Sequence, residues 1–374
     1  MKYLNLILKS IILFYSLYLI KTLLTVNNTM GVERHLMYES GYIRRGLVGE
    51  IFFLLVKYFS FSLDVINFYS SLLIKIGVLI IVLSIIYLKK INFFLIFSAP
   101  LMIAGIVFSA APQWIFGNLD FLLLLIFLLQ IISYRKNKNF ILYLFFSVVG
   151  IMIHELYFFI TIIPSFFLFR QENRKKIIYY IFIISLFVVQ GIHKGNDTQI
   201  LEINKQWNNI GIYNVNINIL KGLVSNSGLN LWWIVNKTFN QKIGFVLNNL
   251  LILFFILLLN YNQKNTRKEI YNFFILICIQ NLVFFSLSMI ANDFGRWYFL
   301  LFTSIILFYY LEKDNIFFTT SNYLEFLPKA LGKLNPYKYI IYFFVGVPFG
   351  NWSLHQLIHS LPYQNMAEII RSIL

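Results

Sequence analysis

The sequence predicts an all-α, polytopic membrane protein with about eleven transmembrane helices. Of its 374 residues, 59% are hydrophobic and only 12% are charged, and the mean hydropathy is +0.73. Soluble domains have far more charged residues than this. Apolar runs long enough to cross about 30 Å of hydrocarbon as helices recur from end to end of the chain. We therefore expect one integral-membrane domain over residues 1–374.

Each predicted helix is an apolar run bounded by charged or turn-forming residues. The first run is too long and too aromatic for a signal peptide and lacks a small-residue cleavage site, so we interpret it as a retained anchor. The predicted helices span residues 10–26, 65–88, 92–110, 118–134, 140–153, 156–169, 177–192, 244–260, 271–291, 297–311 and 339–356.

The basic residues predict the topology. The net charge of +16 would suit nucleic acid, but the lysines and arginines punctuate the hydrophobic runs, so we expect no nucleic-acid partner. With the N-terminus in the cytoplasm, one face receives the basic runs at 89–90, 135–138, 170–176 and 263–268 and the connection 312–338. Most acidic residues then lie on the other face. The positive-inside rule therefore predicts a cytoplasmic N-terminus.

Two long connections then lie outside, at residues 27–64 and 193–243. The first contains "LVGEIFFLLVKYFSFSLD", which is apolar but too short and too charged for an independent span. We predict an interfacial helix there, lying along the membrane surface. The second connection is too short for a separate domain.

The first external loop also contains "ESGYIRRGLVGE" (39–50). Arg44 and Arg45 form either a fork that binds phosphate or pyrophosphate, or two interfacial anchors that snorkel to headgroups. Gly41, Gly46 and Gly49 allow close backbone approach, either to a ligand or to another helix.

Glu39, His154 and Glu155 are the candidate catalytic residues. Glu39 could hold or abstract a proton from a sugar hydroxyl, or form a plain salt bridge to the arginines. His154 and Glu155 are surrounded by hydrocarbon in "VVGIMIHELYFFITII", where ionisable groups usually face an interior cavity; the alternative is a buried structural pair. On a continuous helix these neighbours would point about 100° apart, so only one would face a given ligand.

Further polar residues fall on the same predicted face. Asp293 and Arg296 in "NDFGRW" either pair within one helical turn or provide a second phosphate-binding arginine with its orienting carboxylate. Asp120 in "APQWIFGNLD" is interpreted as a first-turn acid of the following helix.

No metal site is predicted. His355 and His359 have helical spacing, but no third ligand follows them. The single cysteine, Cys278, excludes an internal disulfide and a cysteine metal cage.

The chain resembles the Wzy-type repeat-unit polymerases of bacterial O-antigen and capsule gene clusters and, more distantly, the GT-C superfamily of polyprenyl-linked glycosyltransferases. The resemblance rests on the many helices, on acid and arginine in "ESGYIRRGLVG", on the long later external loop and on "NDFGR" near a helix end. GT-C enzymes commonly carry an Asp-centred motif in the first external loop, whereas the nearest acids here are Glu33 and Glu39. The base therefore stays unassigned.

The resemblance implies glycosyl transfer from a polyprenyl-(pyro)phosphate-linked glycan, such as one on undecaprenyl pyrophosphate, outside the bacterial inner membrane. Arginines would stabilise the leaving pyrophosphate, and a carboxylate or histidine would deprotonate the acceptor hydroxyl. The implied partners are the lipid-linked oligosaccharide, membrane lipids and a chain-length regulator. No cofactor is implied for a polymerase, although some GT-C relatives use a divalent metal ion.

Other functions stay open at this point. The protein could be a GT-C-type transferase that adds a single sugar from a polyprenyl-phosphate sugar, or a flippase, transporter or acyltransferase. A transporter should place polar residues deep in many spans, whereas the polar strings here collect mostly at one interface. We therefore favour the repeat-unit polymerase.

Overall fold

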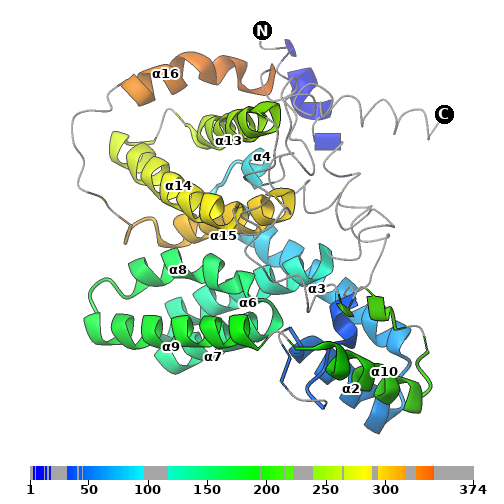
Figure 1. The fold of residues 1–374 in the computed structure, drawn as a ribbon. Helices are drawn as coiled ribbons and strands as arrows, with labels where there is room; N and C mark the ends of the chain where they lie inside the picture. The colour runs from blue at the N-terminus through cyan, green and yellow to red at the C-terminus, as the bar shows by residue number, and fades with distance from the viewer. Residues whose placement is uncertain are drawn as a thin grey trace, which may run out of the picture. The chain divides into compact units, whose positions relative to one another are not determined.

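The computed structural model is built from helices (Figure 1). It describes residues 32–39, 42–43, 45–96, 117–193, 195–213, 215–218, 220–221, 239–262, 265–288, 294–316, 318 and 326–340, together with short stretches between residues 3 and 17. Within these ranges no residue forms a β-strand. The predicted all-α class is therefore confirmed for the described chain.

Four described helices are long and apolar enough to cross a membrane. They are α3 (Leu63–Lys89), α9 (Asn173–Ile192), α13 (Phe239–Asn260) and α14 (Arg267–Ser288). Three shorter apolar helices are α7 (Phe140–Ile153), α8 (Leu156–Leu168) and α15 (Phe294–Glu312). These helices are typical of a membrane protein, but the predicted count of about eleven spans is not confirmed.

Parts of several predicted helices lie outside the described residues. Of the run 92–110, only α4 (Phe93–Ile96) is described, and the run 339–356 contributes only its first two residues. Before that run, α16 (Phe326–Leu334) is followed by the 3₁₀ turn η4 (Asn335–Tyr337). His355 and His359 also fall outside the described residues.

Contacts divide the chain into two compact units. One comprises residues 1–22, 82–107 and 229–374; the other, called unit 2 below, comprises residues 23–81 and 108–228. In the first unit α14 and α15 are joined by ring contacts among Phe284, Tyr298 and Phe302, with the last two rings stacked at 3.9 Å. The prediction of one membrane domain stays a prediction.

Unit 2 is organised by a four-helix group of α6 (Gly117–Asn137), α7, α8 and α9, which lie side by side in Figure 1. Its interior contains a hydrogen-bond network centred on Gln130. The Gln130 amide donates to the carbonyl of Tyr143 at 2.9 Å and also to Ser147, while the hydroxyl of Tyr157 donates to the Gln130 carbonyl oxygen at 2.7 Å. A satisfied polar network in an apolar interior fixes the register of the helices that share it.

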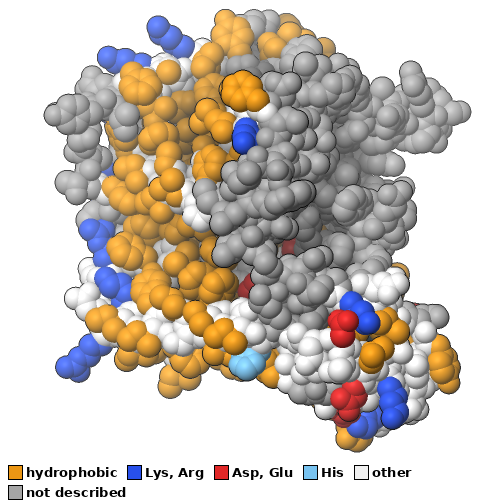
Figure 2. Space-filling model, viewed as in Figure 1, with side chains coloured by type: hydrophobic (Ala, Val, Ile, Leu, Met, Phe, Trp, Pro, Cys, Tyr) orange, Lys and Arg blue, Asp and Glu red, His pale blue; other side chains and the backbone are white. Residues whose placement is uncertain are grey.

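The outer side of α9 is apolar. Hydrophobic side chains dominate the face shown in Figure 2 where α8 and α9 lie. The large hydrophobic residues exposed on α9 are Ile177, Ile178, Ile181, Phe182, Ile184, Val188, Val189 and Ile192. A helix that is apolar toward its surroundings is expected to face lipid.

The helix predicted in the first external loop is present as α2 (Leu47–Phe59). It starts after Gly46 and ends at Ser60, whose left-handed backbone (φ 54°) stops the helix. With 13 residues it is about 20 Å long, too short to cross a bilayer. Its location at the membrane surface stays a prediction.

Candidate functional site

The two ends of α7 differ in chemistry. At its N-terminal end, the hydroxyl of Tyr134 donates to the carboxylate of Glu172 at 3.1 Å, which joins the last turn of α6 to the turn after α8. Both turns carry the basic runs at 135–138 and 170–176. At its C-terminal end lie His154 and Glu155. Within unit 2, two basic turns thus share one end, and the candidate catalytic pair lies at the opposite end of α7.

Arg45 forms a bidentate ion pair with Glu155. Arg45 Nε donates to Glu155 Oε2 at 2.9 Å, and Nη2 donates to Oε1. Both side chains are mostly buried, with exposed fractions of 14% and 23%. A fork-to-fork pair of this kind fixes both position and orientation of the two groups. It brings together two of the predicted polar strings, 39–50 and 154–155.

The backbone of Arg45 is left-handed, with φ at 63°. This region is unfavourable for residues with a Cβ atom, and a residue held there costs about 1–3 kcal/mol. This backbone conformation directs the Arg45 guanidinium toward the turn between α7 and α8. Such conformations are found at sites where geometry matters for function.

His154 interrupts the helix. Its backbone is extended (φ −160°, ψ 130°) and caps α7 before α8 begins at Leu156. The His154 Nδ1 accepts a hydrogen bond from the Leu156 N–H at 3.1 Å and lies 3.6 Å from Glu155 Oε2. Because Nδ1 is an acceptor, we assign the proton of the neutral ring to Nε2. The expectation that only one of these neighbours faces a ligand used the geometry of a helix, whereas both residues lie in the turn between α7 and α8; it stays a prediction.

A glycine shapes this turn. A Cβ atom built at Gly150 would lie 2.3 Å from the ring of Tyr157, far inside van der Waals contact. Only glycine therefore lets the end of α7 approach the first turn of α8 this closely. The turn that carries His154 and Glu155 depends on this contact.

Glu39 has a different partner from those considered in the sequence. Its Oε1 accepts a hydrogen bond from Lys57 Nζ at 2.7 Å, on the last turn of α2. This bond is the main cause that raises the pKa of the Lys57 ammonium. Both side chains are about one-third exposed, so the pair contributes little to stability. A catalytic role for Glu39 stays a prediction.

The glycines of the first loop lie against the protein itself. A Cβ atom at Gly49 would lie 1.9 Å from the Leu36 carbonyl oxygen, and one at Gly46 would lie 2.6 Å from the Tyr38 ring. The close approach seen here is therefore between α2 and the segment before it. Approach to a ligand at Gly46 and Gly49 stays a prediction.

The remaining predicted site residues are not described in full. Gly41, Arg44 and Asp293 lie outside the described residues, and Arg296 is described only as part of the α15 backbone. Asp120 lies in the first turn of α6, as expected, and is buried.

The two predicted external loops contact each other in unit 2. The Trp207 indole N–H, on α10 (Asp197–Asn209), donates to the His35 carbonyl at 2.9 Å; His35 belongs to the 3₁₀ turn η1 (Val32–His35). The Trp207 ring also meets Phe53 of α2 edge-on at 5.2 Å. Residues from both loops therefore form one layer, and this layer continues into Arg45.

Aromatic hydroxyls lie in the same layer. The rings of Tyr38 and Tyr42 stack at 5.5 Å, and the Tyr38 N–H donates to the Glu50 carboxylate at 2.6 Å. The amide of Gln190, at the end of α9, donates to the Tyr42 hydroxyl. Burial raises the pKa of both tyrosines, so they stay protonated and available as donors at neutral pH.

The arrangement brings an arginine fork, a carboxylate and an imidazole together at the α7–α8 turn. Within the described part of the chain, no group of three His, Cys, Asp or Glu side chains is placed to hold a metal ion. Comparison of the chain with protein-family models, curated proteins and solved structures finds no match.

Proposed function

We propose that the protein transfers a glycosyl group from a polyprenyl-(pyro)phosphate-linked glycan on the extracytoplasmic side of a bacterial inner membrane. In this proposal it polymerises the repeat units of an O-antigen or capsule, with Arg45, His154 and Glu155 at the reaction centre. The observation that carries the proposal is the mostly buried Arg45–Glu155 pair beside His154. It holds an anion-binding fork next to a proton acceptor, and the reaction needs both.

The pair supports an exchange mechanism. The pyrophosphate of the donor takes the place of the Glu155 carboxylate on the Arg45 fork, because planar guanidinium donors match phosphate oxygens equally well. The carboxylate so released is then positioned to accept a proton. His154 Nδ1 lies 3.6 Å from Glu155 Oε2 and already accepts the Leu156 N–H, so Glu155 rather than His154 takes the proton.

The proposed reaction is a single displacement at the anomeric carbon of the donor sugar. The acceptor hydroxyl oxygen attacks the anomeric carbon, and the bond from this carbon to the pyrophosphate oxygen breaks. The leaving electron pair stays on the pyrophosphate, where the guanidinium stabilises the developing charge. The hydroxyl proton passes to Glu155, which acts as general base. Nothing else is consumed.

The sidedness of unit 2 supports the proposed location. The basic turns lie at one end of α7 and Arg45–Glu155 at the other, so a cytoplasmic position for the basic turns would place the pair near the outer surface. The polar layer formed by the loops 27–64 and 193–243 would then meet the glycan on that side.

Deletion of the gene in its source bacterium tests the proposal. We expect surface glycan with a single repeat unit, analysed by gel electrophoresis and mass spectrometry. A truncated repeat unit would instead indicate a single-sugar GT-C-type transferase, and complete repeat units retained inside the cell would indicate a flippase. An unchanged surface glycan would rule out all three functions.

A further inference from the structure

A cavity of about 650 Å³ lies in unit 2, between residues of the two predicted external loops. Its walls come from η1, from the end of α2 through the start of α3, and from residues 210–213 after α10. Its volume is within the range of small-molecule binding sites and far exceeds the space needed by a single ion. None of the residues that line it belongs to the Arg45–His154–Glu155 cluster.

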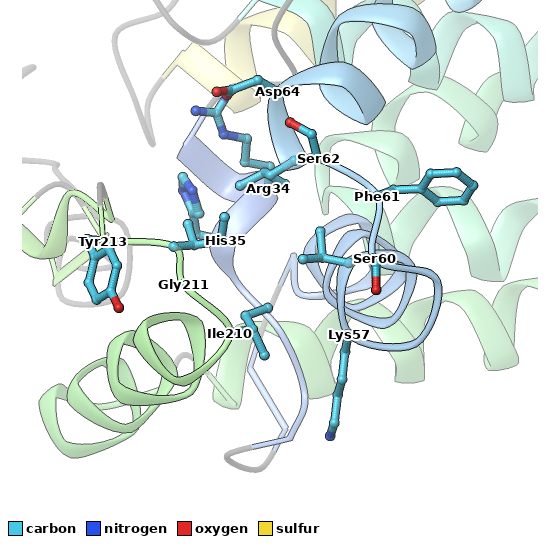
Figure 3. Close-up of a pocket in the computed structure, with 13 residues that line it drawn as sticks. Arg34, His35, Lys57, Ser60, Phe61, Ser62, Asp64, Ile210, Gly211 and Tyr213 are labelled. Atoms are coloured by element: carbon cyan, nitrogen blue, oxygen red, sulfur yellow. The ribbon is translucent and has the colours of Figure 1, made fainter.

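Polar groups gather on one side of the cavity. Figure 3 shows the guanidinium of Arg34 close to the hydroxyl of Ser62 and the carboxylate of Asp64, whereas Lys57 and Phe61 point away from them. Tyr213, on the opposite wall, offers an exposed ring and hydroxyl. Sugars are commonly bound by hydroxyl donors together with an aromatic face, and this lining contains both.

The positive charge of Arg34 is only partly balanced by its surroundings. Its Nε atom is buried and has no hydrogen-bond partner. Burial lowers the pKa of the guanidinium, and the charge of Asp64 opposes this only in part. A partly desolvated cation gains most from an incoming oxyanion, because the anion supplies both the opposite charge and acceptor atoms to the guanidinium.

We propose that this cavity binds a phosphorylated saccharide, with Arg34 holding the phosphate and the opposite wall contacting the sugar. Asp64 competes with the phosphate for Arg34 and thereby weakens binding. If the proposed glycosyl transfer is correct, on which this assignment of a saccharide rests, the cavity holds the second substrate, the acceptor. A transferase needs such a second site, separate from the fork that holds the leaving group.

Binding to the purified full-length protein tests this inference. The protein is placed in nanodiscs of phosphatidylcholine, and calorimetry measures the affinity for glucose 1-phosphate, glucose and inorganic phosphate. We expect glucose 1-phosphate to bind more tightly than either component alone. Arg34→Gln should weaken its binding by about ten- to a hundredfold, the effect of losing charge-assisted hydrogen bonds.

Two further variants sharpen the test. Asp64→Asn should tighten binding severalfold, because it removes the competing carboxylate. Lys221→Gln is the matched control: Lys221 is a cation of the same unit that pairs with Asp197 at 3.4 Å outside the cavity, and its loss should leave the affinity unchanged. If Arg34→Gln does not fold, as judged by gel filtration, the Asp64→Asn result decides: tighter binding supports the inference, and equal or weaker binding overturns it.

Other outcomes would also overturn the inference. Equal affinities for glucose 1-phosphate in wild type and a folded Arg34→Gln protein would remove Arg34 from the site. If the wild-type protein loses glucose 1-phosphate binding in phosphatidylglycerol nanodiscs, and Arg34→Gln removes this dependence on the lipid, then the anion that Arg34 binds is a lipid headgroup. Because the measurement needs no glycan assembly, its failure leaves the deletion phenotype of the proposed function standing.

Discussion

Gly150 and Tyr157 are in contact across the turn that carries His154 and Glu155, since an added Cβ atom at Gly150 would lie 2.3 Å from the Tyr157 ring. The same tyrosine donates a hydrogen bond to Gln130 inside the helix group. The position of the candidate site is thereby tied to the interior of unit 2. A change at one glycine, remote from any ligand, should therefore disturb the site.

The first prediction concerns this contact. Gly150→Val should lower the free energy of unfolding by about 1–3 kcal/mol through overpacking and should abolish glycan polymerisation. Gly191→Ala is the control, because nothing lies within 4 Å of a Cβ atom at Gly191. Thermal unfolding in detergent and the glycan profile measure the two effects. Equal behaviour of the two variants would show that the close contact is unimportant.

A second prediction separates chemistry from structure at the ion pair. Glu155→Gln keeps the shape of the side chain but removes its charge, so polymer should be lost while membrane abundance stays near normal. Arg45→Gln should act likewise, and the double variant should not recover polymer. A purely structural pair predicts the reverse, because the double variant no longer leaves one charge without its partner.

The third prediction concerns the shape of the cation. Arg45→Lys preserves charge but loses the planar fork, so turnover should fall by about ten- to a hundredfold. Arg44→Lys is measured alongside it to test the second arginine of the string. Arg135→Lys, in the basic last turn of α6, serves as control at matched protein level. Full-length polymer in all three variants would mean that Arg44 and Arg45 only anchor the protein.

Sidedness gives a fourth prediction. In a Cys278→Ser background, a cysteine at Leu201, which is 51% exposed on α10, should react with a membrane-impermeant maleimide added to spheroplasts. A cysteine at Lys136, in the basic last turn of α6, should react only after the membrane is opened. The opposite labelling pattern would place the Arg45–Glu155 end in the cytoplasm and remove the lipid-linked donor from its reach.

Sequence periodicity and breakers predicted several helices closely. The predicted run 140–153 matches α7, and its end follows from the polar His154 and Glu155, which interrupt a hydrocarbon segment. The run 244–260 was too short at its start, since α13 begins at Phe239. Polar residues such as Asn240 and Gln241 lowered the apolar signal there without breaking the helix.

The pairing of the site residues was not predictable in the same way. Arg45 and Glu155 are 110 residues apart, and the sequence offered Glu39 as a nearer partner for the arginines. Tertiary packing decided the choice, because Glu39 pairs with Lys57 and Glu50 accepts the Tyr38 N–H. For this pairing the sequence carried one signal, the predicted membrane face of each string. It put residues 39–50 and 154–155 on the same face and did not indicate which side chains pair.

The left-handed backbone at Arg45 makes this position a conflict between stability and activity. In a Glu155→Gln background, where no carboxylate is left without its partner, glycine or asparagine would relieve the backbone there, so selection for thermal tolerance alone should favour them. Natural selection for glycan assembly should oppose that drift. Directed evolution of the Glu155→Gln variant under heat, without a glycan requirement, should therefore lose the arginine early and yield a more stable but inactive protein.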